Sequence, residues 1–134
     1  MPTSEVLYIG DLRTQYTHLQ SGAVLLTDAP TDNQGKGEQF SPTDLVATSL
    51  AGCMMTIMGI FAQRSGFSID GARAEVTKSM GTDPRRISEI KIDLYFPANN
   101  YSDKERAMID YAVKNCPVEL SLHPEIIRNV VCHF

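Results

Sequence analysis

SPTDLVATSLAGC, at residues 41–53, is the stretch of this chain that decides its fold. Its Ser-Pro start supplies a good helix N-cap followed by a proline suited to the first helical position, and Asp44 completes a capping-box-like pattern. From residue 45 to about residue 64 the sequence is apolar nearly all round. This pattern predicts a fully buried central helix, roughly 30 Å long. Gly66 is expected to end it.

The residues before this helix predict strands and a loop. Within residues 1–27, short apolar runs are separated by turn signals at Gly10 and Gly22. Residues 27–39 hold proline, asparagine and two glycines among polar side chains, which is typical of a flexible loop.

The residues after the helix predict a β-hairpin. Residues 68–79 and 87–96 alternate well enough to form two strands, and a Gly-Thr-Asp-Pro turn at residues 81–84 joins them as an antiparallel pair. The apolar residues expected on one face of the second strand are Ile90, Ile92, Leu94 and Phe96.

A second helix and a final strand complete the chain. Ser102 and Glu105 form a second capping box, and helical spacing continues to Pro117, which interrupts the helix. A short helical turn is expected before Pro124, and residues 126–134 form a β-rich run. The order of elements predicts an α+β fold in one domain over residues 1–134.

Composition limits the classes of function. The net charge is −4, and scattered Lys and Arg argue against nucleic acid or an anionic membrane as the main partner. The apolar residues 47–62 are read as a core helix and not as a membrane span. The start of the chain has no secretory signal and the cysteine count of 3 is odd, so the expected location is cytoplasmic.

Two cysteines are the candidates for chemistry. Cys53 lies in the apolar helix, where a free thiol alone is usually a small core hydrophobe. Cys116 stands beside Pro117 at a helix end, where we expect unpaired carbonyls and access to solvent. Two separated thiols on two helices suggest redox chemistry, while Cys132 is read as structural. Histidine and cysteine spacings exclude a zinc site, no fingerprint for a bound cofactor is present, and we expect neither metal nor cofactor.

The first helix also carries small residues and methionines. The small residues at 47–52 would let another element approach the backbone closely, which should compensate the cost of Gly52, about 1 kcal/mol relative to alanine. Met54, Met55 and Met58 would give a soft wall for an apolar ligand, although irregular core filling is the more common use of such residues.

Residues 41–53 resemble the first cysteine motif of the OsmC/Ohr family, the osmotically induced protein C and organic hydroperoxide resistance proteins. Cys116-Pro117-Val118 resembles the second motif, and GFSID at residues 66–70 matches the family's order of elements. The similarity runs from about Val6 to the end of the chain. The joint match of two motifs is specific, although each alone is not.

The resemblance implies a fold and a chemistry. Family members are intertwined homodimers whose long central helices are wrapped by antiparallel β-sheets from both subunits. They reduce organic hydroperoxides or hydrogen peroxide. Carried over, Cys53 would be the reactive thiolate, Cys116 the resolving thiol, and an external dithiol would regenerate the pair.

The sequence departs from the family at one position. Characterised peroxidases carry a glutamate two residues before the leucine of the first motif, which fixes an arginine beside the reactive sulfur; here that position is Thr43. Asp44 could replace it, but we favour its role in the helix cap. The arginine available in the N-terminal strands is Arg13, either a catalytic residue or an exposed strand charge. Nearby His18 is read as a satisfied strand histidine rather than a site residue.

The leading hypothesis is therefore a homodimeric cysteine peroxidase that prefers organic hydroperoxides, because we expect Cys53 in an apolar, methionine-lined pocket. The first alternative is a non-enzymatic small-molecule-binding or redox-sensing protein on the same fold, which the residue Thr43 favours. The second is a thiol-dependent enzyme of another type, such as a transferase.

Overall fold

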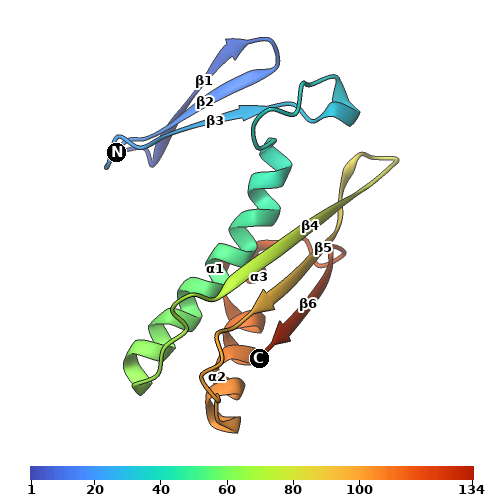
Figure 1. Ribbon diagram of the computed structural model, residues 1–134. Coiled ribbons are helices and arrows are strands. Elements are labelled where there is room, and N and C mark those ends of the chain that lie inside the picture. Colours follow the sequence, from blue (N-terminus) through green and yellow to red (C-terminus); the bar gives the residue numbers. More distant parts are fainter. The chain divides into compact units, whose positions relative to one another are not determined.

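The computed structural model describes residues 1–134, which form two compact units, residues 1–46 and 47–134 (Figure 1). Each unit contains a three-stranded sheet with its own strand order. The mixed α+β composition predicted from the sequence is confirmed. The assignment of residues 1–134 to one domain stays a prediction.

The N-terminal unit is an antiparallel sheet in the order β1-β2-β3. Its strands are β1 (Ser4–Gly10), β2 (Arg13–His18) and β3 (Val24–Asp28), and the short 3-10 helix η1 (Thr31–Asn33) follows. The strands predicted within residues 1–27 are confirmed. The loop predicted from residue 27 begins two residues too early, because Thr27 and Asp28 pair with β2 and are buried.

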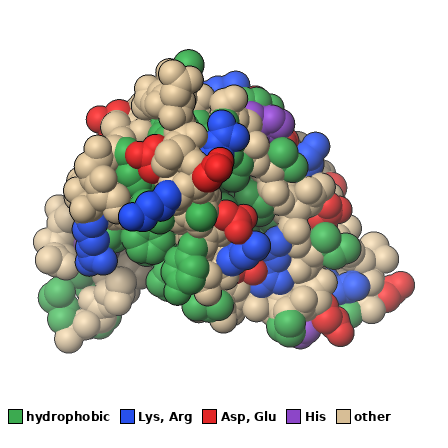
Figure 2. Space-filling model, turned by 90° about the horizontal axis from the view of Figure 1, so that it is seen from below, with side chains coloured by type: hydrophobic (Ala, Val, Ile, Leu, Met, Phe, Trp, Pro, Cys, Tyr) green, Lys and Arg blue, Asp and Glu red, His purple; other side chains and the backbone are tan.

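Both faces of this sheet carry exposed apolar side chains. Directly paired residues point to the same face, so the register places Val6 and Tyr8 on one face and Leu7 and Val24 on the other. All four are more than half exposed. Figure 2 shows hydrophobic side chains among charged ones on the face of the molecule that is seen from below in Figure 1. A single chain therefore leaves apolar strand residues uncovered.

The long helix α1 (Pro42–Ser65) begins and ends as predicted. The backbone N–H of Asp44 donates to Ser41 Oγ, and the N–H of Ser41 donates to Asp44 Oδ2, both at 3.0 Å. This reciprocal pair is the capping box. Gly66 follows the last turn with φ +74°, a conformation that favours glycine.

Burial of α1 is one-sided, and the expectation of a fully buried helix is wrong for the single chain. The fully buried positions follow helical spacing along one stripe: Ala47, Leu50, Ala51, Met54, Met58 and Ala62. Val46 and Ile60 are exposed, and nothing lies within 4 Å of a side chain built at Gly52. By length and composition alone α1 could cross a membrane, a test that core helices also pass.

The C-terminal unit places a sheet of order β4-β5-β6 against helices (Figure 1). Its remaining elements are β4 (Arg73–Gly81), β5 (Arg86–Tyr95), α2 (Asp103–Asn115), α3 (Pro117–Ser121) and β6 (Ile127–His133). Strand β5 pairs antiparallel with β4 and parallel with β6. A parallel neighbour requires a crossover connection, which α2 and α3 provide.

The core of this unit lies between the sheet and the helices. Ile90, Ile92 and Leu94 are fully buried on one face of β5, as predicted, and pack with the stripe of α1 and with α2. The predicted hairpin is confirmed, but β4 starts at Arg73 and not at residue 68, because a turn with Gly71 at φ +88° precedes it. The predicted capping box at Ser102 is confirmed.

Candidate functional site

Cys53 lies near the middle of α1 and is half-buried. It packs against the core cluster beside the fully buried stripe of the helix. Its neighbour Met54 and the more distant Met58 are completely buried core residues. The two methionines therefore serve core packing, the alternative weighed above.

Cys116 occupies the junction between α2 and α3. Pro117 cannot continue α2 and instead takes the first position of α3, so Cys116 is extended, with φ −69° and ψ 148°, and is the N-cap of α3. Its Sγ accepts the backbone N–H of Glu119 at 3.4 Å. Its exposed fraction is 0%, so the expectation of solvent access at this helix end is wrong.

The fold brings the two predicted thiols together. Burial raises the pKa of the Cys116 thiol, the Glu119 N–H opposes this, and interaction with the Cys53 thiol raises the pKa further. An interaction of this kind requires side chains in each other's immediate neighbourhood. Cys53 and Cys116 are separated by a hairpin and a helix in the sequence, yet both belong to the core of the C-terminal unit, Cys116 as a buried member and Cys53 packed against it.

Cys132 is held apart from this pairing by its environment. It lies opposite Leu94 on the helix-facing side of β6 and is partly buried. Burial, followed by the charge of Asp110, raises the pKa of its thiol. Its strand position is confirmed, while its purely structural role stays a prediction.

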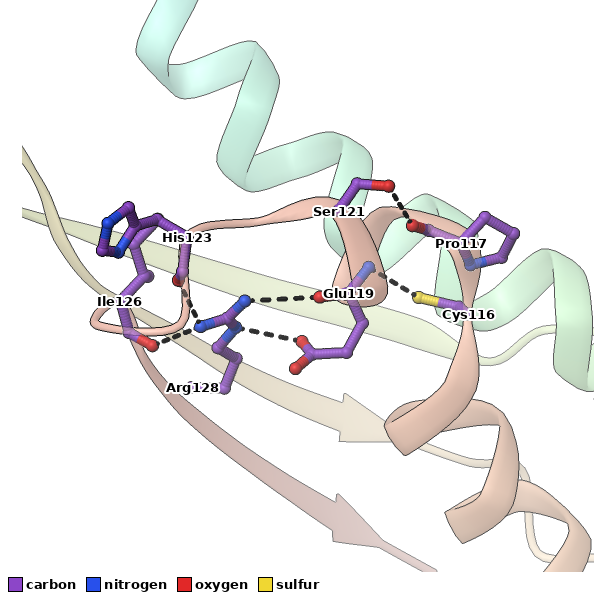
Figure 3. Close-up of polar contacts among 7 residues, drawn as sticks. All are labelled: Cys116, Pro117, Glu119, Ser121, His123, Ile126 and Arg128. Carbon is purple, nitrogen blue, oxygen red and sulfur yellow. Dashed lines mark hydrogen bonds and ion pairs between the residues drawn. The ribbon is translucent and has the colours of Figure 1, made fainter.

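A network centred on Arg128 surrounds the residues after Cys116 (Figure 3). The guanidinium donates from Nε to Glu119 Oε2 at 3.1 Å and from Nη2 to the Glu119 carbonyl at 3.3 Å. Its Nη1 donates to the carbonyls of His123 at 2.9 Å and Ile126 at 2.5 Å. Arg128 thus ties β6 to α3 and to the turn between them.

A pocket of about 220 Å³ opens beside this network. Met54, Val113 and Val130 give it an apolar part, whereas Glu119 and Arg128 contribute charge. The pocket therefore combines a methionine with a polar rim. Neither Cys53 nor Cys116 lines it, so the apolar, methionine-lined pocket expected around Cys53 stays a prediction.

Arg13 lies in the N-terminal unit, where two carboxylates hold it. It faces Asp28 across the β2–β3 ladder, with Nη2 3.5 Å from Asp28 Oδ2 and 2.6 Å from Glu38 Oε2. The N–H of Glu38 donates to Asp28 Oδ2 at 3.1 Å, which joins the two acids. Arg13 is therefore fixed by charge and is not simply an exposed strand cation.

Interactions within this cluster shift the pKa values of Arg13 and Asp28. The hydrogen bond from the Glu38 N–H, followed by the charge of Arg13, holds the pKa of the buried Asp28 carboxyl below its usual value. The hydrogen bond to Glu38, aided by Asp28, raises the pKa of Arg13. Arg13 Nε and Asp28 Oδ1 are buried and have no hydrogen-bond partner within the chain.

The other two residues considered near Arg13 have local roles. Asp44 forms the cap of α1, as favoured above, and the Oγ atoms of Thr43 and Ser41 are 3.1 Å apart. His18 is exposed, and its Nδ1 lies 2.7 Å from Ser21 Oγ in the turn after β2. This geometry accords with the satisfied strand histidine expected from the sequence.

The sequence reasoning missed four residues of these clusters: Asp28, Glu38, Glu119 and Arg128. The position of Asp28 could have been predicted, because a hairpin that turns at Gly22 pairs Asp28 with Arg13. Glu38 was assigned to a flexible loop. Glu119 and Arg128 meet only because β6 runs parallel to β5, which no local pattern reveals.

Comparison with known proteins gives a family. The family model described as OsmC-like protein matches residues 35–129. A crystal structure from Psychrobacter arcticus 273-4, described as an osmotic stress induced and detoxification response protein, is 53% identical, with a TM-score of 0.94 over 99% of this chain and 96% of that chain. The chain belongs to the OsmC-like family.

More distant members share the fold. The organic hydroperoxide resistance protein OsmC from Legionella pneumophila has a TM-score of 0.77 at 14% identity, over 100% of this chain and 98% of that chain. An organic hydroperoxide resistance protein from Vibrio cholerae O1, with captopril bound in one of its active sites, has a TM-score of 0.74 at 15% identity, over 98% and 92% of the two chains.

No curated protein sequence matches the chain. The structure holds no group of three or more His, Cys, Asp or Glu side chains arranged to bind a metal ion.

Proposed function

We propose that this OsmC-like protein is a thiol peroxidase that reduces organic hydroperoxides in the cytoplasm through Cys53 and Cys116. The observation that carries the proposal is that both thiols belong to one core cluster, with Cys116 fully buried in it and Cys53 packed against it. The interaction with Cys53 that raises the pKa of Cys116 supports it. Cys132 lies in a different environment. A peroxidase of this type needs two thiols that can reach one another.

The proposed reaction has two oxidative steps and one reductive step. The Cys53 thiolate attacks the terminal peroxide oxygen, the O–O bond breaks, and the alkoxide leaves as an alcohol after taking a proton, so that Cys53 becomes a sulfenic acid. Cys116 then attacks the Cys53 sulfur, an S–S bond forms, the S–O bond breaks, and hydroxide leaves as water. An external dithiol reduces the disulfide and is itself oxidised to a disulfide.

We propose Arg13 as the cation that assists the first step. A thiol with a pKa of about 8.5 is only about 3% thiolate at pH 7, and lowering the pKa to about 6 raises that fraction roughly 30-fold. The loss of basicity lowers nucleophilicity about 13-fold with a Brønsted slope of about 0.45, so the net gain is only about twofold. The remaining rate acceleration must come from charge that stabilises the transition state. A guanidinium held by Asp28 and Glu38 is suited to supply that charge.

We further propose that the active form is a homodimer. The uncovered apolar residues on both faces of the N-terminal sheet support it, because a three-stranded sheet needs a packed face to be stable. The open space at Gly52 in α1 also supports it, since a partner helix could approach there closely.

Peroxide turnover tests the enzyme proposal. Wild-type protein with a dithiol reductant should consume cumene hydroperoxide, and Cys53→Ser should abolish turnover. Cys116→Ser should stop disulfide formation but leave one rapid oxidation of Cys53 per chain. Cys132→Ser is the matched control and should retain full activity. Full activity in Cys53→Ser would contradict the mechanism.

A binding or redox-sensing role is the second candidate. Thr43 in place of the family glutamate favours it, as does the pocket of about 220 Å³ with both apolar and charged lining. A binding protein would consume no peroxide, and its thermal stability would rise with an apolar small molecule in Cys53→Ser as much as in the wild type. The two candidates therefore differ in whether the protein turns over peroxide.

A further inference from the structure

The residues that follow Cys116 form a tightly bonded unit. Glu119 uses three of its groups at once: its N–H bonds Cys116 Sγ, while its carbonyl and its carboxylate accept from Arg128 (Figure 3). Ser121 Oγ also donates to the Pro117 carbonyl at 2.7 Å. Glu119 therefore links the sulfur of Cys116 directly to the guanidinium of Arg128.

This linkage compensates for the shortness of α3. A helix of five residues has little stability of its own, because helix nucleation is costly. Arg128 donates to three carbonyls and one carboxylate from a strand that is paired with β5. The rigid sheet thereby holds the short helix in place.

The ion pair is also well placed to be strong. The side chains of Arg128 and Glu119 are 15% and 21% exposed, so salt and water screen them little. Arginine presents its donors in a fixed planar fork, which lets it hold a carboxylate and several carbonyls in one geometry. A lysine could not reproduce this arrangement.

We propose that Arg128 and Glu119 are positioning residues that hold the resolving thiol Cys116 at Cys53, and so set how long the Cys53 sulfenic acid survives. The inference rests on the proposed function. In the step concerned, the Cys116 sulfur attacks the Cys53 sulfur, the S–S bond forms and the S–O bond of the sulfenic acid breaks. The leaving hydroxide takes the proton given up by the Cys116 thiol and departs as water. Precise positioning accelerates such an intramolecular step, and misplacement by about 1 Å can cost 100-fold in rate.

The environment of Cys116 fits this role. Burial raises the pKa of its thiol, the Glu119 carboxylate raises it further, and the Glu119 N–H opposes both effects. A buried thiol with a raised pKa is seldom a thiolate, which slows its attack, so close positioning at the Cys53 sulfur matters more for this step. Loosening α3 would expose Cys116 to reagents while separating it from Cys53.

Alkylation of the reduced protein tests the positioning without any peroxide. Arg128→Gln and Glu119→Gln should each raise the rate at which iodoacetamide modifies Cys116 about tenfold, while Cys132 reacts at its wild-type rate. Glu119→Gln keeps the backbone N–H and the side-chain shape, so it tests the ion pair if Arg128→Gln fails to fold. Arg106→Gln is the matched control, because Arg106 also donates to a carbonyl, that of Tyr101, but does not contact α3. An unchanged Cys116 rate in both variants would overturn the proposal.

The lifetime of the sulfenic acid tests the consequence. After one equivalent of cumene hydroperoxide, dimedone added at increasing delays traps the Cys53 sulfenic acid that remains. Both variants should lengthen its lifetime about tenfold while the rate of peroxide loss in the first turnover stays at the wild-type value. An unchanged or shorter lifetime would overturn the assigned role. If wild-type protein never forms the sulfenic acid, the proposed function fails. The alkylation rates still decide whether Arg128 and Glu119 hold Cys116 in place.

Discussion

At the scale of single residues, Arg13 shows how carboxylates from two different segments can hold one guanidinium. The family glutamate that fixes the arginine is absent at Thr43, yet Arg13 is held by Asp28 across a strand pair and by Glu38 from the following loop. Two carboxylates thus fix the guanidinium in the N-terminal unit. The chemistry that a carboxylate supplies depends on its position in space more than on its position in the motif.

Arg13→Gln should lower kcat/KM for cumene hydroperoxide about 100-fold, which is the usual cost of removing one preorganised transition-state donor. Stopped-flow measurement of Cys53 oxidation gives the rate directly. Arg73→Gln is the matched control, since Arg73 also pairs with a carboxylate, that of Glu75, but lies on β4. Equal rates for the two variants would remove Arg13 from the mechanism.

Asp28 predicts an acid dependence of stability. Its folded-state pKa lies below the ordinary value of 3.8, so the unfolded chain binds more protons between the two values and stability rises with pH there. The contribution of Asp28 is complete above pH 3.8 and is lost as the pH falls through the folded-state pKa. In Asp28→Asn the free energy of unfolding, measured by urea denaturation at several pH values, should therefore fall less between pH 3.8 and lower pH than in the wild type. Asp70→Asn, a change at an exposed turn residue, should show the wild-type decrease.

At the scale of elements, α1 is defined by its two ends. The capping box between Ser41 and Asp44 starts it, and Gly66 in the left-handed region stops it. These signals are local, so the sequence predicted both ends correctly. The burial of α1 could not be read in the same way, because its apolar residues surround the helix while one chain covers a single stripe.

Removing the cap should weaken the fold measurably. Ser41→Ala deletes the side-chain acceptor for the Asp44 N–H and should lower the free energy of unfolding by about 1 kcal/mol. Urea denaturation followed by circular dichroism measures it. Ser4→Ala in the exposed start of β1 should change the stability by less than about 0.5 kcal/mol. A loss no larger than that in Ser41→Ala would mean that the cap contributes nothing.

The difference between local signals and contacts of distant segments also explains how much of the site could be predicted. Cys53 and Cys116 stand in recognisable motifs, and the helix break at Pro117 follows from the chemistry of proline. The bonds around Glu119 and Arg128 depend on β6 lying parallel to β5, a pairing between distant segments. Local patterns carry no information about such a pairing, so these contacts became visible only in the folded chain.

At the scale of the whole molecule, exposed apolar surface is the main feature that one chain leaves unexplained. Val6, Tyr8, Leu7 and Val24 divide between both faces of the N-terminal sheet. A second copy of the chain that covers them would bury surface of the kind that stabilises obligate dimers.

We expect light scattering after size-exclusion chromatography to give twice the chain mass of 14.8 kDa. Val6→Asp should shift the protein toward the monomer, because it would bury an unpaired charge in the interface. Thr82→Asp, at an exposed position in the turn between β4 and β5, is the control and should remain dimeric. A wild-type monomer at micromolar concentration would contradict the dimer proposal.

The central claim is that Cys53 and Cys116 form a redox pair, and mass spectrometry of the reduced protein after one equivalent of cumene hydroperoxide tests it most directly. The account predicts rapid loss of two hydrogen atoms per chain, a disulfide mapped to Cys53 and Cys116, and reversal by a dithiol. An unchanged mass, or slow oxidation spread over all three cysteines including Cys132, would contradict it.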